Sequence, residues 1–297
     1  MTDRYGFRNP DHLWDRKPID LVIIGDSFAQ GVCVDSPLSF PDLLRQHHPN
    51  TLNLGMTAHG PLLEFATLQE FADRLHPKTV VWVYFEGNDI QSELLGFWSD
   101  LDQERHHPIL NRYLEQPTFR QALYTLSPEA LTQRYEKVYT APKPPTLYTS
   151  TLQPEISNPL LRRSQRLLTL YYLQKLLNAR YQDKQPLQNP VKIQQLLAQF
   201  SQILKQSRLR VKTADQWLFV YIPAKETLLS NQSHPLYQPV LNIARQNGFD
   251  VVDMYDVLNA KPNALSYYPL LGDHFNEAGQ ALMAEQVNQR ISVIPGM

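Results

Sequence analysis

Residues of the types that cooperate in acyl transfer follow predicted strands or precede a predicted helix: Ser27, Gly55, Asn88 and His274. Acyl transfer to a serine needs a hydroxyl nucleophile, a base with a pKa near neutral, a group that orients this base, and hydrogen-bond donors for the tetrahedral oxyanion. Ser27 is the predicted nucleophile and His274 the predicted base. The backbone N–H groups of Ser27 and Gly55 and the side-chain amide of Asn88 are the predicted donors. Glycine allows close backbone approach, and an amide donates without adding charge.

The serine follows Leu21–Ile24, four apolar residues in a row that end at Gly25. Such a run, rich in β-branched residues, is typical of a strand buried on both faces of a parallel sheet. Active sites of these sheets lie just beyond the carboxyl ends of the strands, which is where Ser27 stands. Taken alone, Gly25-Asp26-Ser27 is more typical of a strand-to-helix turn with Asp26 or Ser27 as the cap, and the other three residues are what favour a site.

Strands and helices are predicted to alternate along the chain. Apolar runs predict strands over Leu21–Ile24, Thr51–Leu54, Thr79–Phe85, Gln216–Ile222 and Phe249–Val252. Apolar residues at helical spacing, or cap signals, predict helices over Phe40–His47, Pro61–Leu75, Pro190–Ser207, Tyr237–Asn247 and Asn276–Val293. This alternation indicates an α/β fold, a parallel sheet with helices on both faces, and it places the ends of the first three strands along one edge.

The segment 99–189 has a different character, because proline recurs through it. Short helices are predicted near 118–126 and 128–138, a longer one near 159–181, and an irregular loop over Thr140–Pro159. We interpret 99–189 as a mainly helical and irregular insertion within a single domain that spans residues 1–297.

Composition excludes several classes of protein. The formal net charge of the 297-residue chain is −1, so no global field draws it to nucleic acid or to an anionic membrane. Cys33 is the only cysteine, which excludes an intrachain disulfide and a multi-cysteine metal site. The pairs His47-His48 and His106-His107 have no partners at ligand spacing, so neither a metal nor another cofactor is expected. No run of about 18 apolar residues predicts a membrane span.

The blocks Gly25-Asp26-Ser27-Phe28, Asn53-Leu54-Gly55, Gly87-Asn88-Asp89 and His274-Phe275-Asn276, in this order, resemble those of the SGNH/GDSL hydrolase superfamily. The resemblance covers about residues 19–98 and 190–293 and leaves the middle of the chain without a motif. It implies a flavodoxin-like, three-layer α/β/α fold with a parallel sheet of about five strands. It also implies hydrolysis or transfer of ester-linked acyl groups on glycans, lipids or small esters. The implied roles are Ser27 as nucleophile, His274 as base, and Gly55 and Asn88 as oxyanion donors.

The residue that orients the base departs from the family pattern. Members of the family usually place an Asp two or three residues before the His, and these positions are Gly272 and Leu271 here. Asp273 is adjacent to His274 instead, and neighbouring residues of an extended segment point in opposite directions unless a tight turn intervenes. Asp273 is the predicted orienting residue. Asp253 and a backbone carbonyl are the alternatives.

Other polar residues near the same sheet edge have simpler interpretations. Asp26 and Asp89 are predicted to bond to nearby backbone and hold their loops. His59 is predicted to be an exposed loop histidine and Lys225 a solvated surface residue, with a place in the cleft as the alternative for each.

The predicted function is serine-dependent ester hydrolysis through an acyl-Ser27 intermediate, with an O-acyl or O-acetyl group of a carbohydrate or another small ester as substrate. One alternative is an O-acyltransferase that passes the acyl group to a glycan hydroxyl. Another is a catalytically weakened carbohydrate-binding or assembly protein of the same fold. The oligomeric state does not follow from the residues. The N-terminus as given has no secretory signal, which predicts a cytoplasmic protein. An extracytoplasmic location follows if Met1 is a truncated start.

Overall fold

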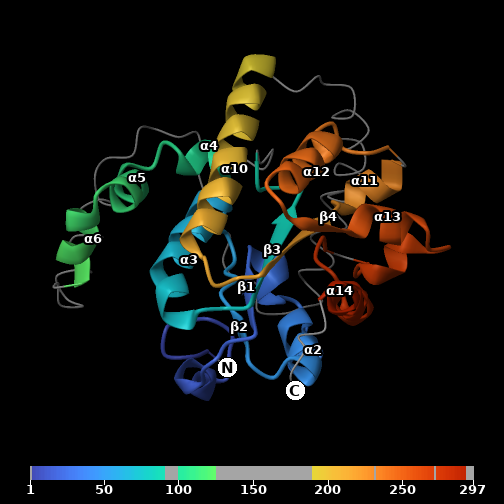
Figure 1. Ribbon diagram of the computed structural model, residues 1–297. Coiled ribbons are helices and arrows are strands. Elements are labelled where there is room, and N and C mark those ends of the chain that lie inside the picture. The colour runs from blue at the N-terminus through green and yellow to red at the C-terminus, as the bar shows by residue number, and fades with distance from the viewer. Residues whose placement is uncertain (1, 91–99, 125–188, 231, 271, 292–297) are drawn as a thin grey trace, which may run out of the picture. The chain divides into compact units, whose positions relative to one another are not determined.

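The computed structural model describes residues 2–90, 100–124, 189–230, 232–270 and 272–291. These form a parallel sheet of β1 (Leu21–Ile24), β2 (Thr51–Asn53), β3 (Thr79–Phe85), β4 (Gln216–Ile222) and β5 (Asp250–Asp253) (Figure 1). The strand order is β2-β1-β3-β4-β5, so the direction of winding reverses between β1 and β3. This is the flavodoxin-like order, in which ligands bind beyond the carboxyl ends of β1 and β3. The predicted fold class is confirmed.

The central strands are apolar because both of their faces are covered. Leu21 of β1 pairs with Thr51 of β2 and with Thr79 of β3, in parallel register on both sides. All four side chains of β1 are buried, and those of β3 and β4 are buried except for one partly exposed residue each, Phe85 and Gln216. Burial of this kind is the main source of folding free energy, and it fixes where each strand ends.

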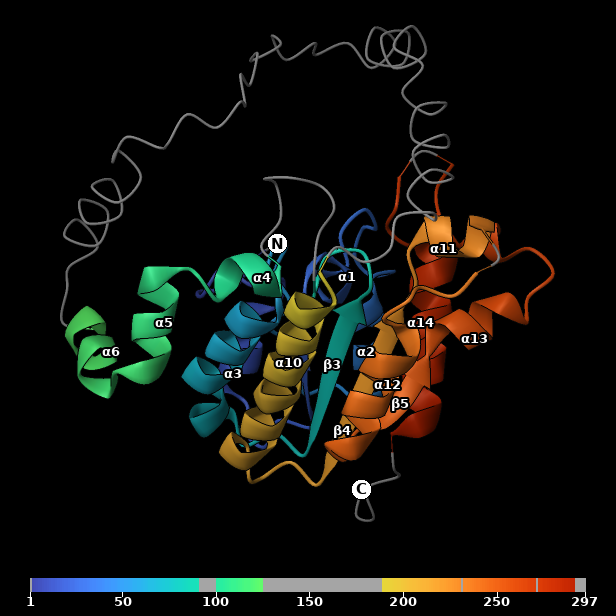
Figure 2. The ribbon, with the colours of Figure 1, turned by 90° about the horizontal axis from the view of Figure 1, so that it is seen from above.

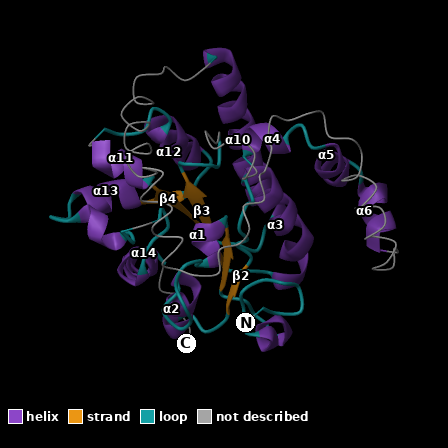
Figure 3. Ribbon diagram, turned by 180° about the vertical axis from the view of Figure 1, so that it is seen from behind, coloured by secondary structure: helices purple, strands orange, loops and turns teal. Residues whose placement is uncertain are grey.

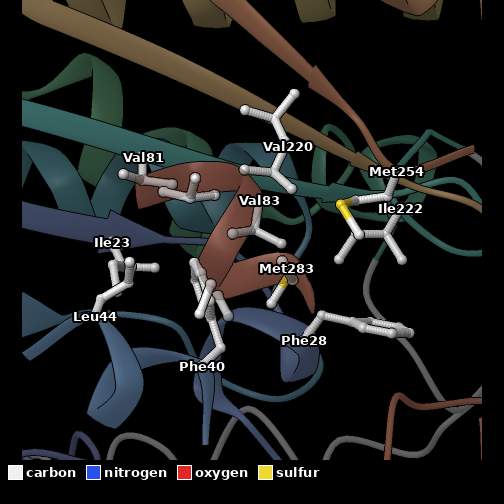
Figure 4. Close-up of a cluster of buried hydrophobic side chains, with 14 of the residues drawn as sticks. Ile23, Phe28, Phe40, Leu44, Val81, Val83, Val220, Ile222, Met254 and Met283 are labelled. Carbon is white, nitrogen blue, oxygen red and sulfur yellow. The ribbon is translucent and has the colours of Figure 1, made fainter. Parts of the chain in front are cut away.

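One face of the sheet is covered by α1 (Ser27–Gln30), α2 (Phe40–His47), α13 (Met254–Asn259) and α14 (Glu277–Arg290). Figure 3 shows α2 and α14 on this face, and Figure 4 shows Phe28, Phe40 and Met283 packed on Val83 of the sheet. Gln280 of α14 is fully buried and accepts a 2.8 Å hydrogen bond from the backbone N–H of Phe40. The last helix of the chain is therefore fixed against an early one.

The opposite face is covered by α3 (Pro61–Leu75), α10 (Pro190–Arg210) and α12 (Tyr237–Gln246), which lie in a row in Figure 2. Aromatic side chains make much of this contact. Phe200 of α10 packs on Tyr84 at 5.6 Å between ring centroids, and Tyr237 of α12 packs on Tyr221 at 5.1 Å. The sheet thus lies between two helical layers.

Element bounds differ from the sequence predictions mainly at the ends. Helix α10 continues to Arg210, three residues beyond the predicted Ser207, and α14 begins at Glu277 because Asn276 is its cap. Strand β2 ends at Asn53, one residue before the predicted Leu54, and β5 is shifted by one residue. Short helices that the periodicity did not predict include α4 (Leu101–Glu104), α5 (Pro108–Glu115), α11 (Lys225–Ser230), α13 and the 3-10 turns Asp11–Asp15 and Ala264–Tyr267.

The chain divides into two compact units, residues 1–111 with 189–297, and residues 112–188. In the second unit the described part includes α6 (Pro117–Tyr124), close to the helix predicted near 118–126, and the Arg112 guanidinium lies 4.4 Å from the centre of the Phe119 ring. The segments predicted at 128–138, 140–159 and 159–181 lie outside the described residues. The interpretation of 99–189 as an insertion in one domain stays a prediction.

The N-terminal segment covers the free edge of β2. The side-chain amide of Asn9 donates to the carbonyl of Asn53 (2.9 Å) and accepts from its backbone N–H (2.9 Å), which imitates one rung of a β-ladder. The carboxylate of Asp3 in turn accepts from the Asn9 amide at 2.7 Å. Covering an edge in this way prevents pairing with another chain and fixes the strand that leads to Gly55.

Candidate active site

Ser27 is the first residue of α1 and lies directly beyond the carboxyl end of β1. The turn that leads to it is tight: Gly25 has a φ of 149°, and a Cβ there would lie 2.7 Å from the carbonyl oxygen of Val83. Asp26 caps the helix by accepting a 2.8 Å hydrogen bond from the backbone N–H of Phe28. Glycine and cap together hold Ser27 at the sheet edge with 3% of its surface exposed.

His274 meets this serine from the other end of the chain. Its Nε2 lies 2.7 Å from Oγ of Ser27, and its ring packs on Phe28 at 4.9 Å between ring centroids. The next residue, Phe275, is fully buried, and Asn276 caps α14 with its side chain. The burial of Phe275 and the cap of Asn276 fix the backbone directly after His274, and so they help to direct its imidazole toward Ser27.

Burial keeps the imidazole of His274 in the neutral form, which is the form that can accept a proton. Burial lowers the pKa of His274 below its ordinary value of 6.5, and the nearby charge of Asp273 opposes this in part. The ring is therefore neutral at neutral pH, and Nε2 can accept the Ser27 proton when Nδ1 carries the ring hydrogen. The hydroxyl has one proton to donate. Nε2 is closer to Oγ than is Oδ2 of Asp26, which lies 3.3 Å away.

Asp26 joins the nucleophile to the predicted oxyanion donor. Its Oδ2 accepts a 3.3 Å hydrogen bond from Nδ2 of Asn88 as well as the contact from Ser27. Burial raises the pKa of Asp26 to about 6, so the carboxylate is charged at pH 7. A charged carboxylate repels an amide oxygen, so the NH₂ group of Asn88 faces Asp26. One N–H of that group bonds to Asp26, and the amide carries a second N–H.

The turn that carries Asn88 is fixed by its own neighbours. The backbone N–H groups of Asn88 and Asp89 donate to the carbonyl of Phe85, at 3.4 and 3.2 Å. The Asp89 carboxylate accepts from the N–H of the same Phe85 at 2.9 Å. Glu86 is buried and accepts a 2.7 Å hydrogen bond from the backbone N–H of Ala224 beyond β4. The prediction that Asp26 and Asp89 bond to nearby backbone is confirmed.

Gly55 differs from its predicted setting. Its N–H donates to Oδ1 of Asn53 at 2.9 Å, so this donor is already engaged. A Cβ at residue 55 would lie 2.5 Å from Cβ of Ala29 and 2.7 Å from the backbone nitrogen of Gln30. Close packing against α1 therefore explains the glycine without any contact to a substrate.

Further along the same loop Ala58 has a φ of 67°, a left-handed conformation that costs a non-glycine residue about 1–2 kcal/mol.

The two carboxylates considered for orienting the base have different surroundings. Asp253 caps α13, accepting from the backbone N–H of Tyr255 at 3.0 Å, and it accepts a 2.5 Å hydrogen bond from the hydroxyl of Tyr237. Its carboxylate thus caps α13 and binds α12 through Tyr237. Asp273 acts on His274 through its charge, which raises the pKa of the imidazole.

Two further residues lie elsewhere than predicted. Lys225 is half-buried rather than solvated, and its ammonium donates to backbone carbonyls of the loop before His274. His59 is largely buried rather than exposed, and burial lowers its pKa to about 4. The sequence offers no signal for the Lys225 contacts, because they join segments far apart in the chain. One signal in the sequence indicated the Asp26–Asn88 contact: both residues follow strands that are neighbours in the sheet.

Among the residues that the structure describes, no three His, Cys, Asp or Glu side chains are grouped so as to hold a metal ion. Nor does the described part of the chain contain a helix with the length and apolar character needed to cross a membrane.

Comparison with known proteins gives the following. No protein-family model matches the sequence, and no curated protein matches it significantly. Among solved structures, that of TesA is similar with a TM-score of 0.44 and 11% identity, over 91% of this chain and 96% of that one. A member of the lipolytic protein G-D-S-L family from Veillonella parvula DSM 2008 is similar with a TM-score of 0.44 and 9% identity, over 92% and 97%. Likenesses at these values carry no weight for function, which must be argued from the residues of the site.

Proposed function

We propose that this protein is an SGNH/GDSL-type serine esterase that hydrolyses O-acyl esters through an acyl-Ser27 intermediate. The observation that carries the proposal is the 2.7 Å contact between Oγ of Ser27 and Nε2 of His274. These residues stand at opposite ends of the sequence and meet beyond the carboxyl ends of the strands, where sheets of this order bind ligands. A hydroxyl and a neutral imidazole at this distance are what nucleophilic catalysis by serine requires.

The first half-reaction forms the acyl-enzyme. Nε2 of His274 takes the hydroxyl proton as Oγ of Ser27 attacks the ester carbonyl carbon, and the carbonyl oxygen becomes an oxyanion. The N–H of Ser27 and the second amide N–H of Asn88 are the proposed donors to it, each worth about 2.7–4 kcal/mol by analogy with known oxyanion holes. The N–H of Gly55 joins them only if its bond to Asn53 is shared or exchanged. The oxyanion then collapses, and the imidazolium protonates the departing alcohol.

The second half-reaction releases the acid. A water molecule attacks the acyl-Ser27 carbonyl carbon while His274 accepts one of its protons. Collapse of the second tetrahedral intermediate breaks the bond to Oγ, and His274 returns the proton to the serine. The substrate class proposed is an O-acylated carbohydrate or another small ester, as the sequence resemblance implies.

The proposal is tested with p-nitrophenyl acetate and a serine-directed phosphonate. Wild-type protein should release p-nitrophenol and take up one phosphonate on Ser27, and Ser27→Ala should lose the label and, by analogy with other serine hydrolases, about 10⁴-fold or more in kcat. Ser207→Ala is the matched control, since Ser207 is also a buried serine but bonds to the carbonyl of Ile203 within α10. Folded wild-type protein with neither turnover nor labelling would refute the proposal. Product analysis with a carbohydrate acceptor present separates hydrolysis from transfer.

A further inference from the structure

A single ammonium group ties down the loop that carries the predicted base. Nζ of Lys225 donates to three backbone carbonyls, those of Pro269 at 2.7 Å, Leu270 at 3.3 Å and Gly272 at 3.2 Å. The carbonyl of Gly272 is two residues from His274. Hydrogen bonds from a charged donor are roughly twice as strong as those between neutral groups, so three of them on one cation make a firm attachment.

The described part of the loop has other anchors besides Lys225: at its start Tyr268 is buried and its ring packs on Phe275. Its C-terminal end is anchored by the burial of Phe275 and by Asn276, whose backbone N–H donates to the carbonyl of Tyr267 at 3.0 Å. At the residues that Lys225 binds, Leu270 is 90% exposed, so the side chain of Leu270 adds little apolar packing. Gly272 has a φ of 144°, a conformation in which the backbone is not restrained by a side chain. His274 lies between the C-terminal anchor and the residues that Lys225 binds.

Lys225 itself lies in a segment that is fixed by hydrogen bonds to the buried Glu86. It is the first residue of α11, just beyond β4, and the preceding residue, Ala224, donates its N–H to the buried Glu86 at 2.7 Å. The hydroxyl of Thr227, in the same turn, also donates to Glu86. Tyr268, at the start of the loop, donates its hydroxyl to the carbonyl of Pro223 at 2.8 Å. These bonds fix Lys225 relative to the ends of β3 and β4, which belong to the same sheet edge as Ser27.

We infer that Lys225 is a positioning residue, which fixes the backbone at Pro269, Leu270 and Gly272 and thereby holds His274 at hydrogen-bonding distance from Ser27. The inference rests on the proposed function for its kinetic consequence, but the attachment of the loop does not depend on it. In this chain the two positions before Asp273 are Leu271 and Gly272, which offer no carboxylate to direct the imidazole. A tertiary contact from Lys225 to the backbone carbonyls of Pro269, Leu270 and Gly272 holds the loop instead.

Two variants isolate the ammonium. Lys225→Met keeps the apolar stem and removes the charge and the donors. Lys225→Cys in a Cys33→Ser background can be aminoethylated, which restores an ammonium at nearly the native position. Removing Cys33, the only native cysteine and an exposed one, confines the reagent to residue 225. Lys192→Met is the control, since Lys192 has a similar exposure but pairs with Asp102, away from this loop.

The first measurement is hydrogen–deuterium exchange of a peptide covering residues 266–276. Exchange of its amides should quicken about ten-fold or more in Lys225→Met, because local opening is no longer opposed by the charged hydrogen bonds, and it should return toward wild type on aminoethylation. Unchanged exchange in Lys225→Met would overturn the inference, whether or not the wild-type protein turns over esters.

The second measurement is steady-state kinetics on p-nitrophenyl acetate. Lys225→Met should lose about ten-fold or more in kcat with KM nearly unchanged, since misplacing a base by about 1 Å costs up to 10²-fold in rate. Aminoethylation should recover most of this loss, and Lys192→Met should match wild type. A change in KM alone, or a kcat that aminoethylation does not raise, would refute a positioning role. Wild-type protein without turnover would refute the proposed function and leave the exchange experiment as the test of Lys225.

Discussion

The two halves of the candidate site are held in different ways. The nucleophile loop, residues 25–31, is fixed by residues next to one another in sequence: Gly25 makes the turn, Asp26 caps the helix, and Ser27 is almost fully buried. The described residues of the base loop, 268–270 and 272–276, depend more on distant residues, above all on the ammonium of Lys225. The nucleophile loop also receives hydrogen bonds from Met56 and Arg8, but the turn and the cap that place Ser27 are local.

This difference has a mechanical consequence. A loop made from a strand end, a tight turn and a helix cap keeps its shape whenever the sheet is folded, because the bonds span a few residues. The base loop can open while the sheet stays intact, because side-chain hydrogen bonds, those of Lys225 and Tyr268 among them, join it to the segment beyond β4. The geometry of the pair is therefore expected to vary through His274 rather than through Ser27. Substitutions on the nucleophile side should therefore act by removing a chemical group, and those on the base side by changing the position or the pKa of His274.

After Ser27→Ala itself, the largest effect is expected on the nucleophile side, from Asn88→Ala. The change removes the proposed oxyanion donor and one of the hydrogen bonds to Asp26, whose carboxylate is buried. Loss of a single oxyanion donor costs about 10²–10³ in kcat. We expect a fall of this size with little change in KM, measured on p-nitrophenyl acetate, and phosphonate labelling of Ser27 slowed in proportion.

Asn247→Ala is the matched control for this variant. Asn247 is half-buried where Asn88 is buried, and its side-chain amide likewise donates hydrogen bonds, here to Ser201 and to the carbonyl of Ile243. It lies at the end of α12, so its loss should leave kcat unchanged. Equal kcat for Asn88→Ala and Asn247→Ala would remove Asn88 from the oxyanion site.

A smaller effect is expected on the base side, from Asp273→Asn. The charge of Asp273 raises the pKa of His274, while burial lowers it by more, so the acid limb of kcat/KM should lie below pH 6.5 in the wild type. Only the neutral imidazole can accept the serine proton. Removing the charge lowers the pKa of His274 further, and the limb should move to lower pH.

The plateau of kcat/KM should fall by about five-fold in Asp273→Asn, since a half-buried charge near an imidazolium stabilises it by about 1 kcal/mol. The measurement is a pH–rate profile of both proteins between pH 4 and 9. A limb that stays in place would assign the orientation of His274 to a backbone carbonyl. A limb that moves to higher pH would contradict the electrostatic argument itself.

The sequence predicted the parts of the fold that local chemistry decides. The apolar run Leu21–Ile24 and the longer run Thr79–Phe85 are strands because a side chain buried on either face must be apolar. The register of these strands, and the layer that each helix joins, required the three-dimensional structure. Helix α11 was missed because its six residues, Lys225–Ser230, are too few to show a period.

The candidate site shows the same division. Ser27 and Asn88 follow strands whose ends are readable, so their presence at one edge followed from the topology of parallel sheets. Gly55 was assigned by type, and the sequence could not show that packing on Ala29 already requires a glycine there. The Lys225 contacts were unpredictable for a different reason: their acceptors are backbone carbonyls, which every residue carries and which leave no mark in a sequence.

The smallest effect on activity is expected from Asp253→Ala, although Asp253 is the other carboxylate considered for the base. Its side chain caps α13 and accepts the hydroxyl of Tyr237, so both of its functions are structural in the described part of the chain. Loss of a helix cap costs about 1 kcal/mol in the free energy of unfolding. We expect a loss of that size in urea unfolding and a kcat/KM within about two-fold of wild type. Asp253→Asn keeps a capping oxygen and should recover most of the stability. A variant that unfolds like wild type but has lost activity would instead make Asp253 the group that orients His274. The base would then be held from β5 rather than from its own loop, and the contrast between the two loops would no longer hold.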